Sequence, residues 1–184
     1  MHLAASAIRL GEIDQALVLG ASIMVNPGQT LAFAKLGVLS PTGSSKSFDA
    51  AADGYAHAEG FAAVLVKRLD LAIRDGDHIY CVITGSAIGA NGKGKLLTTP
   101  QADAQVMTVR AAYDRANRNP AEAFYVELHA TGTLAGDPIG VNGAGKVFSK
   151  GHDSEKTLRG EGEHGPRWRM FFHGQFNQGR PHAP

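Results

Sequence analysis

The sequence contains very little cysteine and almost no net charge, and each shortage removes a class of protein. One cysteine in 184 residues excludes an internal disulfide framework and a zinc site built from cysteines. A net charge of +1 gives no reason to expect nucleic acid or an anionic membrane as a partner. No apolar run approaches the length that spans a bilayer. The first residues also lack the basic and apolar segments of a secretory signal.

What remains is the composition of an ordinary globular protein. The chain is 43% hydrophobic and 19% charged, and its 23 glycines predict many tight loops. A chain of this size buries roughly 70% of the surface that it exposes when unfolded. We therefore expect a cytoplasmic protein that holds no metal and binds neither nucleic acid nor membrane.

The most informative stretch runs from residue 124 to residue 139. Phe124 to Leu128 is aromatic and β-branched, which predicts a short buried strand that ends at His129. Small residues follow, and Asp137-Pro138 predicts a helix start with an N-cap carboxylate and an early proline. A histidine at a strand end is more often structural than catalytic, so these residues alone leave both roles open.

The order of residues in this stretch favours the catalytic role. His-Ala-Thr-Gly-Thr-x-x-Gly-Asp-Pro-Ile, from His129 to Ile139, resembles the His-Gly-Thr-Gly-Thr-x-x-Gly-Asp-Pro-Ile-Glu signature of β-ketoacyl synthase domains in type I polyketide synthases. The match departs at Ala130, where glycine is usual, and at Gly140, where glutamate is usual. Residues 11–14, 48–60, 85–88 and 91–100 also resemble segments of the same family, so the resemblance covers residues 2 to about 159.

The resemblance implies a fold and a chemistry. The fold would be the thiolase-like layered αβαβα fold, here partial, and the reaction a decarboxylative Claisen condensation of an acyl thioester with a malonyl-type extender. His129 would polarise the thioester carbonyl of the extender, and Thr131 and Thr133 would bind the phosphopantetheine arm of an acyl carrier protein. Glu59, as either a buried paired carboxylate or an exposed surface residue, and Asp137 would be structural residues near the site. Partners would include acyl carrier protein, other synthase domains and a second copy of the domain.

The rest of the chain divides by pattern. Helices are expected over residues 3–10, 69–74, 101–117 and 137–148, and buried strands over 16–21, 61–66, 79–83 and 124–128, with crossover connections. Residues 24–45 are expected to be rich in loops. We expect residues 1–75 to end the N-terminal ketosynthase half, 76–159 to begin the C-terminal half, and 160–184 to form a divergent, disordered tail.

Two of the three catalytic positions of the family have no match. The resemblance places the nucleophilic cysteine just before Met1 and the second histidine where the divergent tail begins. Cys81 lies in an apolar stretch and reads as an inert small hydrophobe. His164, His173 and His182 fit no ligand spacing. The chain is thus either part of a catalytic ketosynthase interrupted by its gene model, or a non-catalytic remnant or interaction module; the fragment alone is expected to be inactive.

Overall fold

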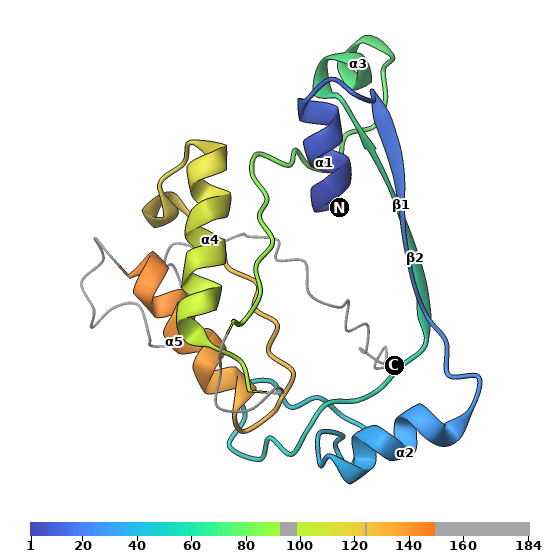
Figure 1. Cartoon of the computed structure of the whole chain (residues 1–184), viewed down its shortest axis with the longest axis vertical. Helices are drawn as coiled ribbons and strands as arrows, with labels where there is room; N and C mark the ends of the chain where they lie inside the picture. Colours follow the sequence, from blue (N-terminus) through green and yellow to red (C-terminus); the bar gives the residue numbers. More distant parts are fainter. Residues whose placement is uncertain (93–98, 124, 150–184) are drawn as a thin grey trace, which may run out of the picture.

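The computed structural model describes residues 1–92, 99–123 and 125–149, and the chain follows an open, ring-like path (Figure 1). Residues 93–98, which belong to the family-like segment 91–100, and the expected tail at 160–184 lie outside the described residues. The elements in chain order are α1 (His2–Arg9), β1 (Gln15–Ser22), α2 (Pro27–Lys35), β2 (Gly60–Lys67), α3 (Leu69–Arg74), α4 (Ala102–Ala116), the short 3-10 helix η1 (Pro120–Glu122) and α5 (Gly136–Phe148).

The four expected helices form within one or two residues of their predicted bounds. Gly11 follows α1 with φ +72°, and Asn117 ends α4 in the left-handed conformation, as their sequence positions indicate. The expectation of a loop-rich stretch at 24–45 is wrong in part, because it contains α2. Asn26 caps that helix by accepting a hydrogen bond from the Gly28 amide at 2.9 Å, and Pro27 follows it. This Asn-Pro pair is a start signal that the sequence does carry.

Strands β1 and β2 form one antiparallel ribbon. The register pairs Gln15 with Lys67 at one end and Ser22 with Gly60 at the other. Both strands were expected to be buried and joined through crossovers. Within the described residues they instead pair with each other alone, and most of their residues are exposed. The expectation is wrong because both outer edges of the ribbon lack a neighbouring strand in this part of the chain.

The two faces of the ribbon differ. Directly paired residues share a face, so Leu17 and Leu65 lie with Phe61 on one side of the sheet. These three side chains are 63%, 61% and 77% exposed, respectively. Helix α1 packs against both strands, and Val18 and Val66 on the opposite face are half-buried. Within the described part of the chain, the ribbon therefore presents one uncovered apolar face.

The main core lies between α4 and α5, which run side by side (Figure 1). Val106 and Val109 of α4 are buried against Val147 and Phe148 of α5. The ring of Tyr113 meets that of Phe148 edge to face, with centroids 5.8 Å apart. None of the described side chains is less than 2% exposed, so this core is small.

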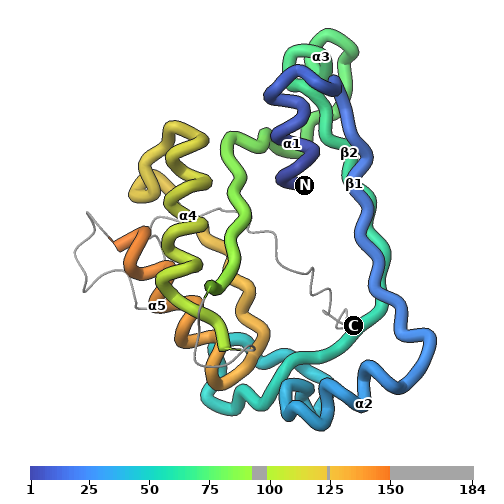
Figure 2. Tube along the Cα trace, viewed as in Figure 1, coloured from blue at the N-terminus to red at the C-terminus, as the bar shows by residue number. Residues whose placement is uncertain are grey.

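A segment without regular structure, residues 79–92, runs alongside α4 (Figure 2). Two glycines permit the close approach: a Cβ on Gly85 would lie 2.2 Å from the Ala112 carbonyl oxygen, and one on Gly89 would lie 2.1 Å from the Thr108 hydroxyl. The Arg115 guanidinium donates to the Ser86 carbonyl at 2.9 Å. The packing of this segment thus depends on the absence of side chains at both glycines.

Two expected strands do not form. Residues 79–83 and 125–128 carry no strand pairing, and Phe124 lies outside the described residues. An apolar, β-branched stretch becomes a strand only where another strand offers hydrogen bonds, and neither stretch has such a neighbour in the part of the chain that the structure describes. Over the same residues, no helix is long and apolar enough to cross a bilayer.

Candidate active-site loop

Residues 129–137 form a loop that leads directly into α5. The Gly136 amide donates to the Thr133 hydroxyl at 3.1 Å, and the Asp137 amide donates to the Thr133 carbonyl at 3.2 Å. Thr133 therefore satisfies two of the free amides at the helix start. The expectation that Asp137 is the N-cap is wrong, because α5 begins at Gly136 and Asp137 lies inside its first turn.

The carboxylate of Asp137 binds amides outside its own helix. Its Oδ1 accepts a hydrogen bond from Gly132 at 3.1 Å, and its Oδ2 accepts one from Phe48 at 2.9 Å. The residue is only 6% exposed. A buried carboxylate is stable when hydrogen bonds compensate its lost hydration, and its place in the first turn of α5 adds a favourable dipole. Asp137 thus links this loop to a segment 89 residues earlier in the chain.

Gly132 occupies a position where a side chain would clash with neighbouring backbone. Its φ of +78° lies in the left-handed region, and a Cβ would come within 2.7 Å of the Lys46 amide nitrogen. The Gly132 carbonyl accepts a hydrogen bond from the Gly54 amide at 3.0 Å. The loop around Gly132 and the segment from Lys46 to Gly54 are therefore in direct backbone contact.

The two threonines lie together beside this contact. The hydroxyl oxygens of Thr131 and Thr133 are 3.1 Å apart, and both residues are half-buried. Because the Thr133 oxygen already accepts the Gly136 amide, a proton of the Thr133 hydroxyl is free to be donated to Thr131 or to a ligand. The pair thus offers adjacent hydroxyl groups in a loop, an arrangement suited to polar atoms of a substrate.

His129 stands at the exposed start of the loop. Its side chain makes no hydrogen bond, ion pair or ring contact among the described residues. The following residue, Ala130, has φ +35°, and its carbonyl accepts a hydrogen bond from the Ser47 hydroxyl. Among the described residues the imidazole therefore has no polar partner, and its ring nitrogens are available for a ligand.

The segment from Lys46 to Gly54 is the partner that sequence reasoning did not find. Ser47 and Phe48 bind the loop directly, and Phe48 has φ +61°, an unusual value for a bulky residue. The Lys46 ammonium pairs with Asp53 and is the main cause that lowers the pKa of that carboxyl below its usual value. The family-like Phe-Asp-x-x-Ala-Asp-Gly-Tyr motif marks this segment, but nothing in its residues says that it contacts residues 130–137.

Comparisons with known proteins agree with the family resemblance of the loop from His129 to Asp137. Residues 1–72 match the family model described as β-ketoacyl synthase, N-terminal domain, and residues 80–160 match the β-ketoacyl synthase, C-terminal domain. The chain belongs to the β-ketoacyl synthase family. Its structural neighbours are ketosynthases of the thiolase-like fold, of which this chain holds a part.

Both sequences and solved structures give relatives of this ketosynthase segment. It is 49% identical over 150 residues to the highly reducing polyketide synthase srdA of Neurospora crassa, covering 82% of this chain and 6% of that protein. It is 47% identical to polyketide synthase ThaG of Burkholderia thailandensis, over 80% of this chain and 3% of that protein. The module 6 ketosynthase of the Bacillus subtilis bacillaene synthase superposes with a TM-score of 0.78 at 41% identity.

The segment is much shorter than these relatives. It covers 27% of the bacillaene ketosynthase chain, which in turn covers 81% of the segment. The oxazolomycin ketosynthase domain OzmH KS7 of Streptomyces albus gives a similar result, with a TM-score of 0.77, 40% identity and coverages of 83% and 27%. The chain therefore represents about a quarter of a ketosynthase.

Glu59 does not occupy the expected buried pair. Its side chain is exposed, no ion pair to it occurs among the described residues, and its Oε1 accepts a hydrogen bond from the Met24 amide at 2.6 Å. Of the two alternatives for Glu59 the surface position holds, because the ribbon end that carries this residue is uncovered among the described residues. The neighbouring His57 has a packing role: its ring meets that of Phe33 edge to face at 5.7 Å.

Cys81 is exposed in the irregular segment 79–92, not enclosed in the expected strand. Across residues 1–92, 99–123 and 125–149, no three histidine, cysteine or acidic side chains are placed to hold a metal. His164, His173 and His182 lie outside the described residues.

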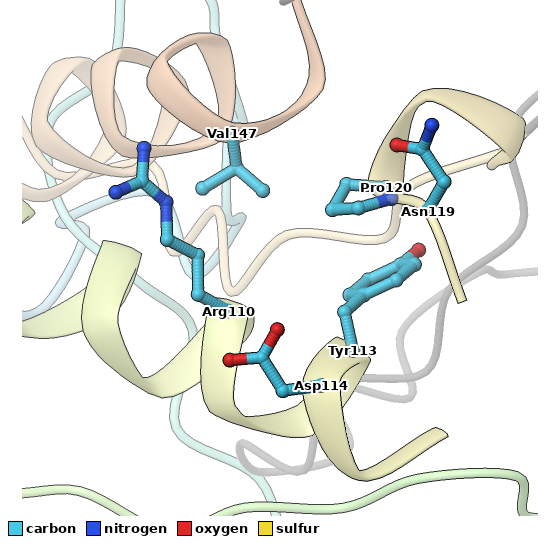
Figure 3. A pocket seen from close by; sticks show the side chains of 6 residues that line it. All are labelled: Arg110, Tyr113, Asp114, Asn119, Pro120 and Val147. Carbon is cyan, nitrogen blue, oxygen red and sulfur yellow. The ribbon is translucent and has the colours of Figure 1, made fainter. Parts of the chain in front are cut away.

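One pocket, of about 260 Å³, lies away from the His129 loop (Figure 3). It is lined by Arg110, Tyr113 and Asp114 of α4, Asn119 and Pro120 at the start of η1, and Val147 of α5. Partial burial raises the pKa of the Tyr113 hydroxyl above its usual value. No residue of the loop from His129 to Asp137 lines the pocket, so it is not part of the candidate site.

Proposed function

We propose that this chain is the part of a polyketide synthase ketosynthase that supplies the first catalytic histidine. The observation that carries the proposal is the His129–Asp137 loop, fixed by hydrogen bonds from backbone amides to the Asp137 carboxylate, in a chain that is 41% identical to a solved ketosynthase. The complete domain would be an acyltransferase that condenses an acyl thioester with a malonyl-type extender. Residues 1–75 and 76–159 would belong to its N-terminal and C-terminal halves.

In this proposal each loop residue has a separate task. The exposed imidazole of His129 polarises the thioester carbonyl and stabilises the charge that develops as carbon dioxide leaves. The paired hydroxyls of Thr131 and Thr133 bind the phosphopantetheine arm of the carrier protein. The substrate therefore arrives on a carrier protein. We further propose that the reaction takes place in the cytoplasm and that the complete domain acts as a homodimer beside other synthase domains.

The 184-residue chain by itself would not condense acyl groups. A condensing enzyme needs a nucleophile to hold the growing acyl chain, and the one thiol, Cys81, stands in an irregular, exposed segment. Purified chain offered an acyl thioester and malonyl-carrier protein should show no condensation product and no stable acyl group by mass spectrometry. Stable acylation of Cys81 would contradict this proposal.

The alternative is a non-catalytic remnant or interaction module with the same fold. The small core between α4 and α5 and the uncovered face of the β1–β2 ribbon favour it, because an exposed apolar face suits a polypeptide that packs against another surface. The two functions differ in one respect that can be measured: a module has no requirement for the imidazole of His129.

The deciding experiment places residues 1–149 in the aligned segment of the bacillaene module 6 ketosynthase and compares His129→Ala with His78→Ala. His78 is a second exposed histidine, whose ring meets that of Tyr80 edge to face, so it controls for the loss of an imidazole. His129→Ala should lower condensation by roughly 10²- to 10³-fold and leave acyl loading unchanged. His78→Ala should change neither.

The threonines provide a second, distinguishable result in the same completed domain. Thr131→Ala and Thr133→Ala remove contacts made in ground and transition states alike, so they should weaken carrier-protein binding more than turnover. Should His129→Ala condense at the unmodified rate, the histidine is structural and the module is the better account of this chain.

A further inference from the structure

The pocket between α4, η1 and α5 has a shape and a set of polar groups that the proposed function does not use (Figure 3). Its volume of about 260 Å³ lies just below the usual range of ligand pockets, so it suits a compact molecule. None of its lining residues belongs to the loop from His129 to Asp137. What the pocket binds is therefore independent of the function proposed above.

Part of the pocket is apolar and already in place. Val147 of α5 is buried, and the Tyr113 ring is held by its edge-to-face contact with Phe148, with centroids 5.8 Å apart. Pro120 adds a second ring to the lining, and Asn119 beside it is fixed as the cap of η1. Because these groups need no rearrangement, an apolar ligand group that packs among them costs the protein little conformational entropy.

The pocket also has two opposite charges, those of Arg110 and Asp114 on α4 (Figure 3). They are one helical turn apart, a spacing at which opposite charges often pair, although the order with the basic residue first is the less favourable one. Neither side chain forms an ion pair among the described residues. Arg110 instead donates to the Lys146 carbonyl at 3.5 Å, the outer limit for a hydrogen bond. Both charges are therefore available to a ligand.

We propose that this pocket binds a free amino acid with an apolar side chain. The ligand's carboxylate accepts hydrogen bonds from the Arg110 guanidinium, and its ammonium group pairs with the Asp114 carboxylate. Its side chain packs against Tyr113, Pro120 and Val147. A simple carboxylic acid would bind Arg110 but bring its charge close to Asp114, and a simple amine would have the reverse problem. A ligand with both charges gains at both residues and meets no like charge.

Saturation-transfer NMR on L-leucine, in the presence of the 184-residue chain, tests the site. Both charged side chains are exposed, so the expected dissociation constant is about 1–10 mM. Two further probes have the leucine side chain and one charge each: isocaproate lacks the ammonium group, and isoamylamine lacks the carboxylate. Each should bind about 3- to 10-fold more weakly than leucine, because one attraction is lost and one repulsion remains.

Two variants with side chains of similar size locate the binding. Asp114→Asn should abolish the preference for leucine over isocaproate, and it should bind isocaproate at least as tightly as the unmodified chain does. Arg110→Gln should likewise abolish the preference for leucine over isoamylamine. Asp103→Asn is the matched control: it removes a carboxylate from the first turn of the same helix that is 85% exposed and outside the pocket, so both preferences should remain.

Three results would overturn the assignment. The first is the absence of saturable leucine binding up to about 50 mM, well above the expected dissociation constant. The second is equal affinity of the unmodified chain for leucine, isocaproate and isoamylamine, which would mean that the two charges do not recognise the ligand. The third is retention of both preferences in Asp114→Asn and Arg110→Gln, which would place the bound leucine elsewhere on the chain.

Discussion

Replacing Gly132 with alanine should separate the loop at residues 130–137 from the segment at residues 46–54. Gly11→Ala provides a control with the same backbone conformation. The φ values are +78° and +72°, so both substitutions carry the left-handed penalty of about 1–2 kcal/mol, partly offset through the unfolded state by roughly 0.4–1 kcal/mol. They differ in space. A Cβ on Gly11 meets nothing within 4 Å, whereas one on Gly132 lies 2.7 Å from the backbone nitrogen of Lys46.

Relief of this contact must move backbone, because the obstructing atom is not the end of a flexible side chain. Movement of Gly132 breaks its hydrogen bond from Gly54 and the one to the Asp137 carboxylate. Net values for a neutral and a charged hydrogen bond are about 0.5–1.5 and 1.5–3 kcal/mol, so Gly132→Ala should destabilise the contact by about 2–4 kcal/mol more than Gly11→Ala destabilises its own turn.

The assay is hydrogen exchange by mass spectrometry on residues 46–54 and 130–137. Gly132→Ala should accelerate exchange in both segments by roughly 30- to 1000-fold, the factor that corresponds to this free energy. Gly11→Ala should leave both segments at the rate of the unmodified chain. Equal exchange in the two variants would refute the reasoning, because it would mean that the loops are not in backbone contact.

Three further outcomes are expected. Ala130→Gly should stabilise the loop by up to about 1 kcal/mol, since it removes the left-handed strain at φ +35°, and an unchanged or lower urea midpoint would contradict this. Arg74 and Lys67 lower the pKa of Asp75 from 3.8 to about 2, so the stabilisation it gives is present above pH 4 and is lost as the pH falls toward 2. Asp75→Asn should flatten the dependence of stability on pH in that window; an unaltered slope would exclude the pairing. Leu19 is 70% exposed on the uncovered face and should promote association between copies of the chain. Leu19→Lys should therefore delay elution of the chain from a sizing column. An unchanged elution volume would argue against association through this face.

The sequence was informative about local structure and about the residues of the candidate loop. Helix α4 follows from its 3.6-residue period, and the caps at Gly11 and Asn117 follow from residue types that tolerate positive φ. The motif from His129 to Asp137 identified the family, which the comparisons confirm. These features depend on neighbours within a few residues, so a single sequence contains them.

The errors concern interactions between distant parts of the chain. The stretch at 79–83 has the residues of a strand, but strand formation needs a partner, and the segment packs on α4 through Gly85 and Gly89 instead. Glu59 has the charge for a buried pair but lies on an exposed ribbon end. Asp137 has the residue type of an N-cap. The structure shows instead that its carboxylate accepts a hydrogen bond from the Phe48 amide, in a segment far earlier in the chain.

The bonds between Asp137 and Phe48 and between Ser47 and Ala130 join residues 89 and 83 positions apart, so the site is completed late during synthesis. At about 5–20 residues per second, the ribosome needs roughly 4–18 s to make the second partner after the first. During that interval the unusual backbone at Phe48 has no support from Asp137. Closing so long a loop also costs entropy before any contact forms. The rate at which the chain forms the loop from His129 to Asp137 is therefore limited by synthesis of the later half of the sequence, and slow translation between Phe48 and Asp137 would prolong the exposure of the earlier half.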